Sequence, residues 1–178
     1  MEMLVVAVVR VLGSLPVLRW AFAGALIAIL VDFSDLFLRN LLDLGGIPDY
    51  QRFDKLMDLV YMVLFLVVAL RWRGLARDIA VGLFAFRMAG FAVFQITDAR
   101  PVLLAFPNVF EFWFVYVAAV LHWRPHHVVT PREATFALVP LLLLKLFQEY
   151  ALHQAKWLDG FTAVEAVEAI WEWATSPF

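Results

Sequence analysis

Five long apolar segments constrain the fold of this chain more than any other feature. They cover about residues 17–38, 55–72, 78–97, 101–123 and 134–152. A helix of about 20 apolar residues crosses the hydrocarbon core of a bilayer, because each residue advances the helix by about 1.5 Å. Hydrophobic residues make up 64% of the chain, against about 45–50% in soluble domains. The sequence therefore predicts an all-α integral membrane protein, a single domain over residues 1–178 with a bundle of about five transmembrane helices.

Both ends of the chain are expected to lie at the membrane surface. Residues 3–18 are apolar but short, and Arg10 and Pro16 interrupt them. We expect an N-terminal interfacial helix there rather than a full span. Near the C-terminus, Thr162 followed three residues later by a glutamate is a capping-box pattern. It predicts an amphipathic helix over about 162–174 that lies in the interface plane, with glutamates along one face.

Lysine and arginine positions orient the predicted bundle. With the N-terminus inside, the inner flanks carry Arg10, Arg19, Arg71, Arg73, Arg77, Arg124 and Arg132. The outer flanks then carry Arg39, Arg52, Lys55, Arg100 and Lys156. Positive residues favour the cytoplasmic side of a membrane. The sequence thus predicts a protein of the plasma (inner) membrane with a cytoplasmic N-terminus.

Ionisable residues interrupt the apolar segments, mostly in the half that this orientation places outside. A charged side chain near the middle of a bilayer costs at least about 2.5–3.5 kcal/mol, so these groups are expected to converge on one another or on water. The candidate ligand- or ion-binding residues are Asp32, Asp35, Asp54, Asp58, Arg87, Asn108, Glu111, Lys145, Glu149 and His153.

Acidic groups outnumber basic groups in this predicted cavity. The acids are Asp32, Asp35, Asp54, Asp58, Asp98, Glu111 and Glu149, and the bases are Arg39, Arg87, Arg100 and Lys145. Divalent cations prefer carboxylate oxygens, and crowded carboxylates tend to keep a proton. We expect an outward-facing acidic cavity that binds or translocates a small cation or a proton. A purely structural network of salt bridges is the competing interpretation.

The two deepest charges are expected to form an ion pair. Arg87 lies near the middle of the third segment, and Glu111 is the comparably deep acid on the fourth. Pro107 is expected to break the fourth segment one turn before Glu111. Neighbouring antiparallel helices would bring the two depths together, so the sequence predicts a direct Arg87–Glu111 pair.

Four aspartates have the spacing D-x2-D … D-x3-D, namely Asp32, Asp35, Asp54 and Asp58. Over about thirty residues this pattern resembles the motif of the CDP-alcohol phosphotransferases. The resemblance implies that the four aspartates hold divalent metal ions and that Asp58 acts as a base. The chain departs from the motif where Leu36 replaces a glycine and Arg39 comes one residue early. A metal-dependent enzyme acting on lipid head groups is therefore one alternative function, with a divalent cation as its cofactor.

Other chemistries are excluded by what the sequence lacks. The chain has no cysteine, so it has no disulfide, thiolate metal site or cysteine nucleophile. It has no P-loop, no G-x-S-x-G elbow and no Glu-x-x-His pair. A net charge of -2 predicts no nucleic-acid partner. The expected partner is the lipid bilayer. The third functional alternative is an accessory subunit whose charges dock other membrane subunits or a second copy of this chain.

Overall fold

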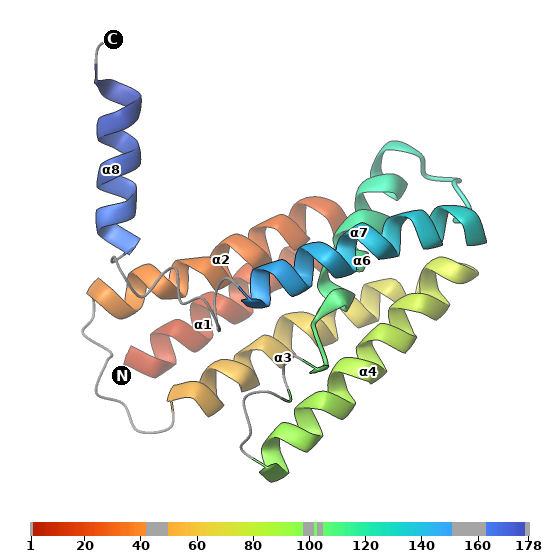
Figure 1. Ribbon diagram of the computed structural model, residues 1–178, viewed down its shortest axis with the longest axis horizontal. Helices are drawn as coiled ribbons and strands as arrows, with labels where there is room; N and C mark the ends of the chain where they lie inside the picture. Colours follow the sequence, from red (N-terminus) through yellow and green to blue (C-terminus); the bar gives the residue numbers. More distant parts are fainter. Residues whose placement is uncertain (1, 42–49, 98–101, 103–104, 151–162, 177–178) are drawn as a thin grey trace.

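The computed structural model describes residues 2–41, 50–97, 102, 105–150 and 163–176, and these residues contain helices and no strand. The elements in chain order are α1 (Glu2–Ser14), the 3-10 turn η1 (Leu15–Leu18), α2 (Ala21–Leu41), α3 (Tyr50–Ala69), α4 (Leu75–Thr97), α6 (Val109–Trp123), α7 (Pro131–Glu149) and α8 (Ala163–Thr175). The all-helical prediction is confirmed. Helices α2, α3, α4, α6 and α7 correspond to the five apolar segments (Figure 1).

An aromatic core holds these helices together, and α6 supplies most of it. Phe110, Trp113 and Phe114 of α6 have no exposed surface. The ring of Phe114 stacks on Phe65 of α3, with 4.2 Å between the centroids. The indole N–H of Trp113 donates a 3.1 Å hydrogen bond to the Ala76 carbonyl at the start of α4. Because a buried indole needs a hydrogen-bond partner, this contact fixes the height of α6 against α4.

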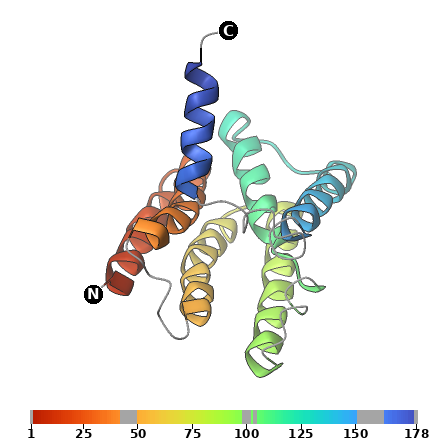
Figure 2. The same cartoon turned by 60° about the vertical axis from the view of Figure 1, so that its left-hand side comes forward.

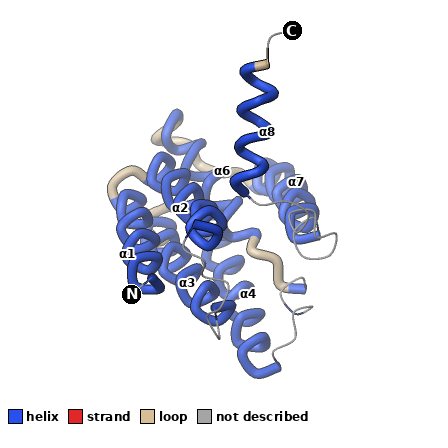
Figure 3. Tube along the Cα trace, turned by 90° about the vertical axis from the view of Figure 1, so that its left-hand side faces the viewer, coloured by secondary structure: helices blue, strands red, loops and turns tan. Residues whose placement is uncertain are grey.

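Helix α1 packs along the bundle, which differs from the interfacial helix expected there. It contacts both α2 and α3 (Figure 3). Val6 has no exposed surface, and Arg10 is only 5% exposed. Gly13 allows α2 to come close, since a Cβ at this position would lie 2.7 Å from Val31 Cγ2. The expectation failed because Arg10, taken as an interruption of the apolar run, finds acidic partners inside the bundle.

One end of the bundle gathers basic and aromatic residues, and we call it the basic end. The starts of α2, α4 and α7 meet there with the ends of η1, α3 and α6, on the right in Figure 1. Arg71 donates a 3.0 Å hydrogen bond to the Leu18 carbonyl, and the Phe22 and Trp123 rings lie 5.1 Å apart. Its exposed arginines are Arg19, Arg71, Arg73, Arg77, Arg124 and Arg132. Helix α1 begins at the opposite end (Figure 1).

Helix α6 begins only at Val109, because Pro107 interrupts the chain before it, as the sequence predicted. The broken segment lies against α4 at Gly90. A Cβ on Gly90 would overlap the side chain of Phe106. Glycine at this position therefore allows the broken segment and α4 to pack closely.

This contact gives a stability prediction with a matched control on the same helix. Gly90→Ala is expected to lower the free energy of unfolding by about 1–3 kcal/mol, because an extra methyl in a packed contact forces the chains apart. Gly82→Ala is expected to raise it by about 0.5–1 kcal/mol, since nothing lies within 4 Å of a Cβ there and alanine favours the helix. Thermal unfolding of the purified variants measures both. Equal effects would show that Phe106 does not pack on Gly90.

Helix α8 provides the predicted amphipathic helix near the C-terminus, and it projects from the bundle (Figure 2). Its contacts with the bundle are to α2. Ile170, Trp171 and Trp173 are strongly exposed, while Glu165, Glu168 and Glu172 line the other face.

Among the described residues, α4 alone is long and apolar enough to cross a membrane by length and composition.

Candidate functional site

Polar side chains from six helices meet inside the bundle. We call the group the buried polar cluster, and its members are Arg10, Asp32, Asp58, Tyr61, Arg87, Asn108, Glu111 and Lys145. Of the charged members, those on α2, α3, α4, α6 and α7 lie eleven to fourteen residues from the basic end of their helices. At 1.5 Å per residue this is about 17–21 Å along each axis. The helices therefore bring their charges to nearly the same depth.

Arg10 joins three helices in one part of the cluster. Its Nη2 lies 2.7 Å from Asp58 Oδ1 of α3, and it also pairs with Asp32 of α2. Charge-assisted contacts of this kind are stronger than neutral hydrogen bonds. Arg10 is a central residue that the sequence analysis did not select, although a lone arginine within an apolar run was a signal for it.

Glu111 lies at the centre of a second part of the cluster. Its carboxylate accepts a 3.3 Å hydrogen bond from the Tyr61 hydroxyl and a 3.1 Å hydrogen bond from the Asn108 side-chain amide. The same amide lies 3.4 Å from the Tyr61 hydroxyl oxygen. Asn108 precedes the first residue of α6 but does not cap it with its side chain. The three groups therefore form one closed set of hydrogen bonds.

One acceptor in this set has no partner in the part of the chain that the structure describes. Asn108 is 4% exposed, and its Oδ1 receives no hydrogen bond. A buried acceptor without a donor costs about 1–3 kcal/mol. The nitrogen of the same amide donates to Glu111, so this acceptor belongs to a side chain that contacts the carboxylate directly.

Two cations flank Glu111 without forming a direct ion pair with it. Lys145 donates a 2.9 Å hydrogen bond to Gln148 and lies over the Phe112 ring, 5.3 Å from its centroid. Arg87 donates a 2.7 Å hydrogen bond to the Phe106 carbonyl. Both are nevertheless close enough to interact electrostatically with Glu111.

The predicted direct pair between Arg87 and Glu111 is therefore wrong. The helix break at Pro107 presents the Phe106 carbonyl to α4, and Arg87 binds this carbonyl instead. The matching depth of the two residues was predicted correctly, whereas the acceptor created by the break was not considered.

The remaining candidates fall at or beyond the limits of the described structure. Asp35 lies on α2 one turn beyond Asp32, and Asp54 lies on α3 one turn before Asp58. Glu149 is the last residue of α7. The side chains of these three residues, and His153 as a whole, lie outside the described residues. The side chains of Asp98, Arg39 and Arg100, which were also counted in the predicted excess of acid, lie outside the described residues as well. The described part of the cluster has three acids and three bases, so the excess stays a prediction.

A divalent metal on the aspartates would have to compete with Arg10. Asp32 and Asp58 both contact its guanidinium, so the space between them is taken by a positive charge. Within the described ranges no group of three or more histidine, aspartate or glutamate side chains could hold a metal ion. The fit of a metal therefore rests on Asp35 and Asp54, together with a displacement of Arg10.

Comparison with known proteins gives no relative for this arrangement. The chain matches no protein-family model, no curated protein and no solved structure. The functional argument therefore starts from the geometry of the buried polar cluster.

Proposed function

We propose that this chain is an integral membrane protein that carries protons across the bilayer through the buried polar cluster, with Glu111 as the group that binds and releases the proton. The observation that carries the proposal is the set formed by Glu111, Tyr61 and Asn108. It joins one carboxylate, one hydroxyl that can donate and accept, and one buried acceptor without a described partner. Such a set can pass a proton by exchanging hydrogen bonds.

The surface of the bundle supports a membrane location. Large apolar side chains are exposed along α7, including Phe136 at 70% and Leu143 at 61%. Leu30 of α2 and Ile96 of α4 are exposed at 68% and 85%. Soluble monomers rarely expose contiguous apolar patches larger than a few hundred Å². We infer that α2, α3, α4, α6 and α7 cross the bilayer, with α1 and η1 crossing beside them.

We place the basic end in the cytoplasm, because arginines there satisfy the positive-inside rule. Since α1 runs back along α2, its start then lies outside. The proposed N-terminus is therefore outside, whereas a cytoplasmic N-terminus was expected when residues 3–18 were assigned to an interfacial helix. The charges of the cluster then lie about 17–21 Å from the cytoplasmic side of a core about 30 Å thick, in its outer half.

The charges around Glu111 suit a group that changes its protonation state. Burial and, to a lesser extent, the nearby Asp58 favour the protonated acid, whereas Lys145 and Arg87 favour the carboxylate. These opposing influences allow Glu111 both to bind and to release a proton. A metal ion would need more free carboxylates than the described residues offer.

Proton flux into vesicles tests this proposal. Purified protein in liposomes with an internal pH-sensitive dye is expected to pass protons faster than protein-free liposomes. Glu111→Gln keeps the size and hydrogen bonding of the side chain but cannot release a proton, so flux is expected to fall to the protein-free level. Asp78→Asn is the matched control, because Asp78 is exposed near the start of α4. Wild-type flux through the Glu111→Gln variant would refute the role of Glu111.

A second candidate is the lipid head-group enzyme. One observation favours it, namely that Asp32 and Asp58, the first and last aspartates of the D-x2-D … D-x3-D pattern, reach the same guanidinium. If these residues exchange Arg10 for a metal ion, the protein should release CMP from a CDP-alcohol only with magnesium or manganese present. Asp58→Asn should then abolish the release. No metal-dependent release by the wild type would remove this candidate.

A further inference from the structure

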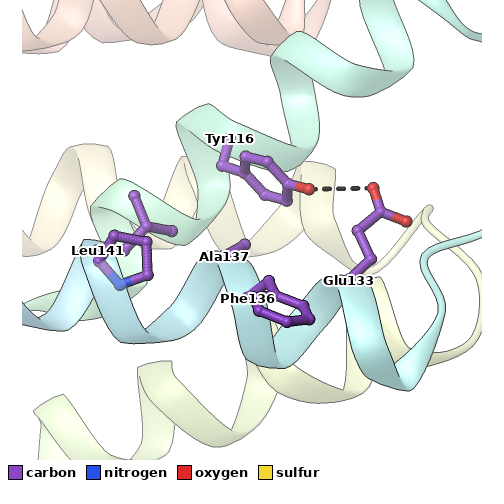
Figure 4. Close-up of a pocket in the computed structure, with 6 residues that line it drawn as sticks. Tyr116, Glu133, Phe136, Ala137 and Leu141 are labelled. Atoms are coloured by element: carbon purple, nitrogen blue, oxygen red, sulfur yellow. Dashed lines mark hydrogen bonds between the residues drawn. The ribbon is translucent and has the colours of Figure 1, made fainter.

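A groove between α6 and α7 lies close to the basic end and outside the buried polar cluster. Its volume is about 340 Å³, and its lining residues are Tyr116, Glu133, Phe136, Ala137, Pro140 and Leu141. Figure 4 shows Tyr116 and Glu133 together at one end of the groove, with Phe136, Ala137 and Leu141 along the rest. The groove is therefore polar at one end and apolar along its length.

The carboxylate at the polar end is already engaged. Glu133 accepts a 3.0 Å hydrogen bond from the Tyr116 hydroxyl, and its other oxygen lies 2.7 Å from His127 Nε2. The carboxylate is thus satisfied by neighbours on both oxygens.

Two exposed arginines lie on the chain around the start of α7. Arg124 is on the connection between α6 and α7, and Arg132 is on the first turn of α7. The Arg132 guanidinium carbon lies 5.6 Å from the centroid of the Phe136 ring, and this ring lines the groove.

The apolar length of the groove matches the environment proposed for α7. Ala137 and Pro140 have small side chains that leave the groove open beside the larger Phe136 and Leu141. The neighbouring surface of α7 continues the apolar character with Val139 and Leu143, which are 54% and 61% exposed. A hydrocarbon chain lying along α7 would contact apolar side chains throughout.

We propose that this groove binds one anionic phospholipid, with its phosphate at Arg132 and an acyl chain along Phe136, Ala137 and Pro140. Charge complementarity selects the occupant, because the Arg132 guanidinium adjoins the groove at Phe136, and both oxygens of Glu133 are already engaged by Tyr116 and His127 and are not available to an amine. The proposal rests on the membrane location proposed above but not on proton transport. A lipid held there would fix α7 against α6 on the cytoplasmic side.

Lipid retention measured by native mass spectrometry of the full chain in detergent tests this proposal. The wild type is expected to keep phosphatidylglycerol in preference to phosphatidylcholine. Arg132→Gln is expected to weaken phosphatidylglycerol retention about fivefold, since one cation near a lipid surface contributes about 1 kcal/mol. Arg73→Gln removes an exposed arginine at the same end away from the groove and is the control. Equal retention of the two lipids by the wild type, or equal effects of the two substitutions, would overturn the proposal.

The apolar part of the site is tested separately. Phe136→Ala changes a largely exposed side chain, so it is expected to fold, and it should shorten retention of phosphatidylglycerol. Glycerol phosphate, which has the charge without an acyl chain, is expected not to compete. Competition by glycerol phosphate, or unchanged retention in Phe136→Ala, would contradict a lipid site. Lipid retention without proton flux would reject the transport proposal alone, whereas flux without selective retention would reject this one alone.

Discussion

Replacing Arg10 by methionine is expected to lower the free energy of unfolding by about 3–5 kcal/mol. The guanidinium is 5% exposed and is the shared partner of Asp32 and Asp58. Without it, two neighbouring carboxylates would repel each other in the interior, and stranding buried charges costs about this much. Thermal or denaturant unfolding of the purified protein in detergent measures the change.

Arg19→Met is the matched control for this prediction. Arg19 is exposed, and its guanidinium carbon lies over the face of Trp20, 5.6 Å from the ring centroid. Its loss is expected to cost at most about 1 kcal/mol. Converting Asp32 and Asp58 to asparagine in the Arg10→Met background should recover part of the loss. If Arg10→Met is no more destabilising than Arg19→Met, Arg10 does not hold α1, α2 and α3 together.

Replacing Arg87 by methionine is expected to cost about 1.5–3 kcal/mol, the contribution of a hydrogen bond to a charged group. The Phe106 carbonyl would lose its 2.7 Å donor at the point where the chain breaks before α6. Because the partner is this carbonyl and not Glu111, the double mutant Arg87→Met/Glu111→Leu is expected to be less stable than either single variant.

Arg77→Met on the same helix is the control, since its pairing with Asp78 is exposed and such pairs contribute about 0–1 kcal/mol. Recovery of stability in the double mutant would restore the direct Arg87–Glu111 pair and contradict the carbonyl contact. Unfolding of the four variants under one condition gives the comparison.

The positions of the helices could be read from the sequence because each depends on neighbouring residues. Local residues mark the helix boundaries. Helix α3 ends shortly before Arg71, α6 begins after the break around Pro107, and α7 begins at Thr130–Pro131. The common depth of Asp58, Arg87 and Glu111 followed in the same way, because depth is a count of residues along a helix.

The partners of the buried charges could not be read in this way. Arg10 meets Asp58 across 48 residues of sequence, and only the packing of α1 between α2 and α3 brings them together. Tyr61 shares a helix face with Asp54 and Asp58 by its spacing, but it was not selected as a site residue. Its hydroxyl became informative only once α6 placed Glu111 beside it.

Arg87 shows a third limit of sequence reasoning. An arginine at mid-depth was correctly expected to need a partner, and the acid at comparable depth on the next helix was chosen. The backbone carbonyl of Phe106 has no signature in the sequence beyond the following proline, and its position depends on the close approach that Gly90 allows.

The measurement that tests the central claim most directly follows protonation at Glu111 itself. Infrared difference spectra of the protein in lipid, recorded across a pH titration, detect the carbonyl band of a carboxylic acid as it gains and loses its proton. We predict that a titrating band of the wild type is absent from Glu111→Gln and retained in Asp78→Asn. Identical titrating bands in the wild type and in Glu111→Gln would contradict the account, because the proton would then be carried by another group.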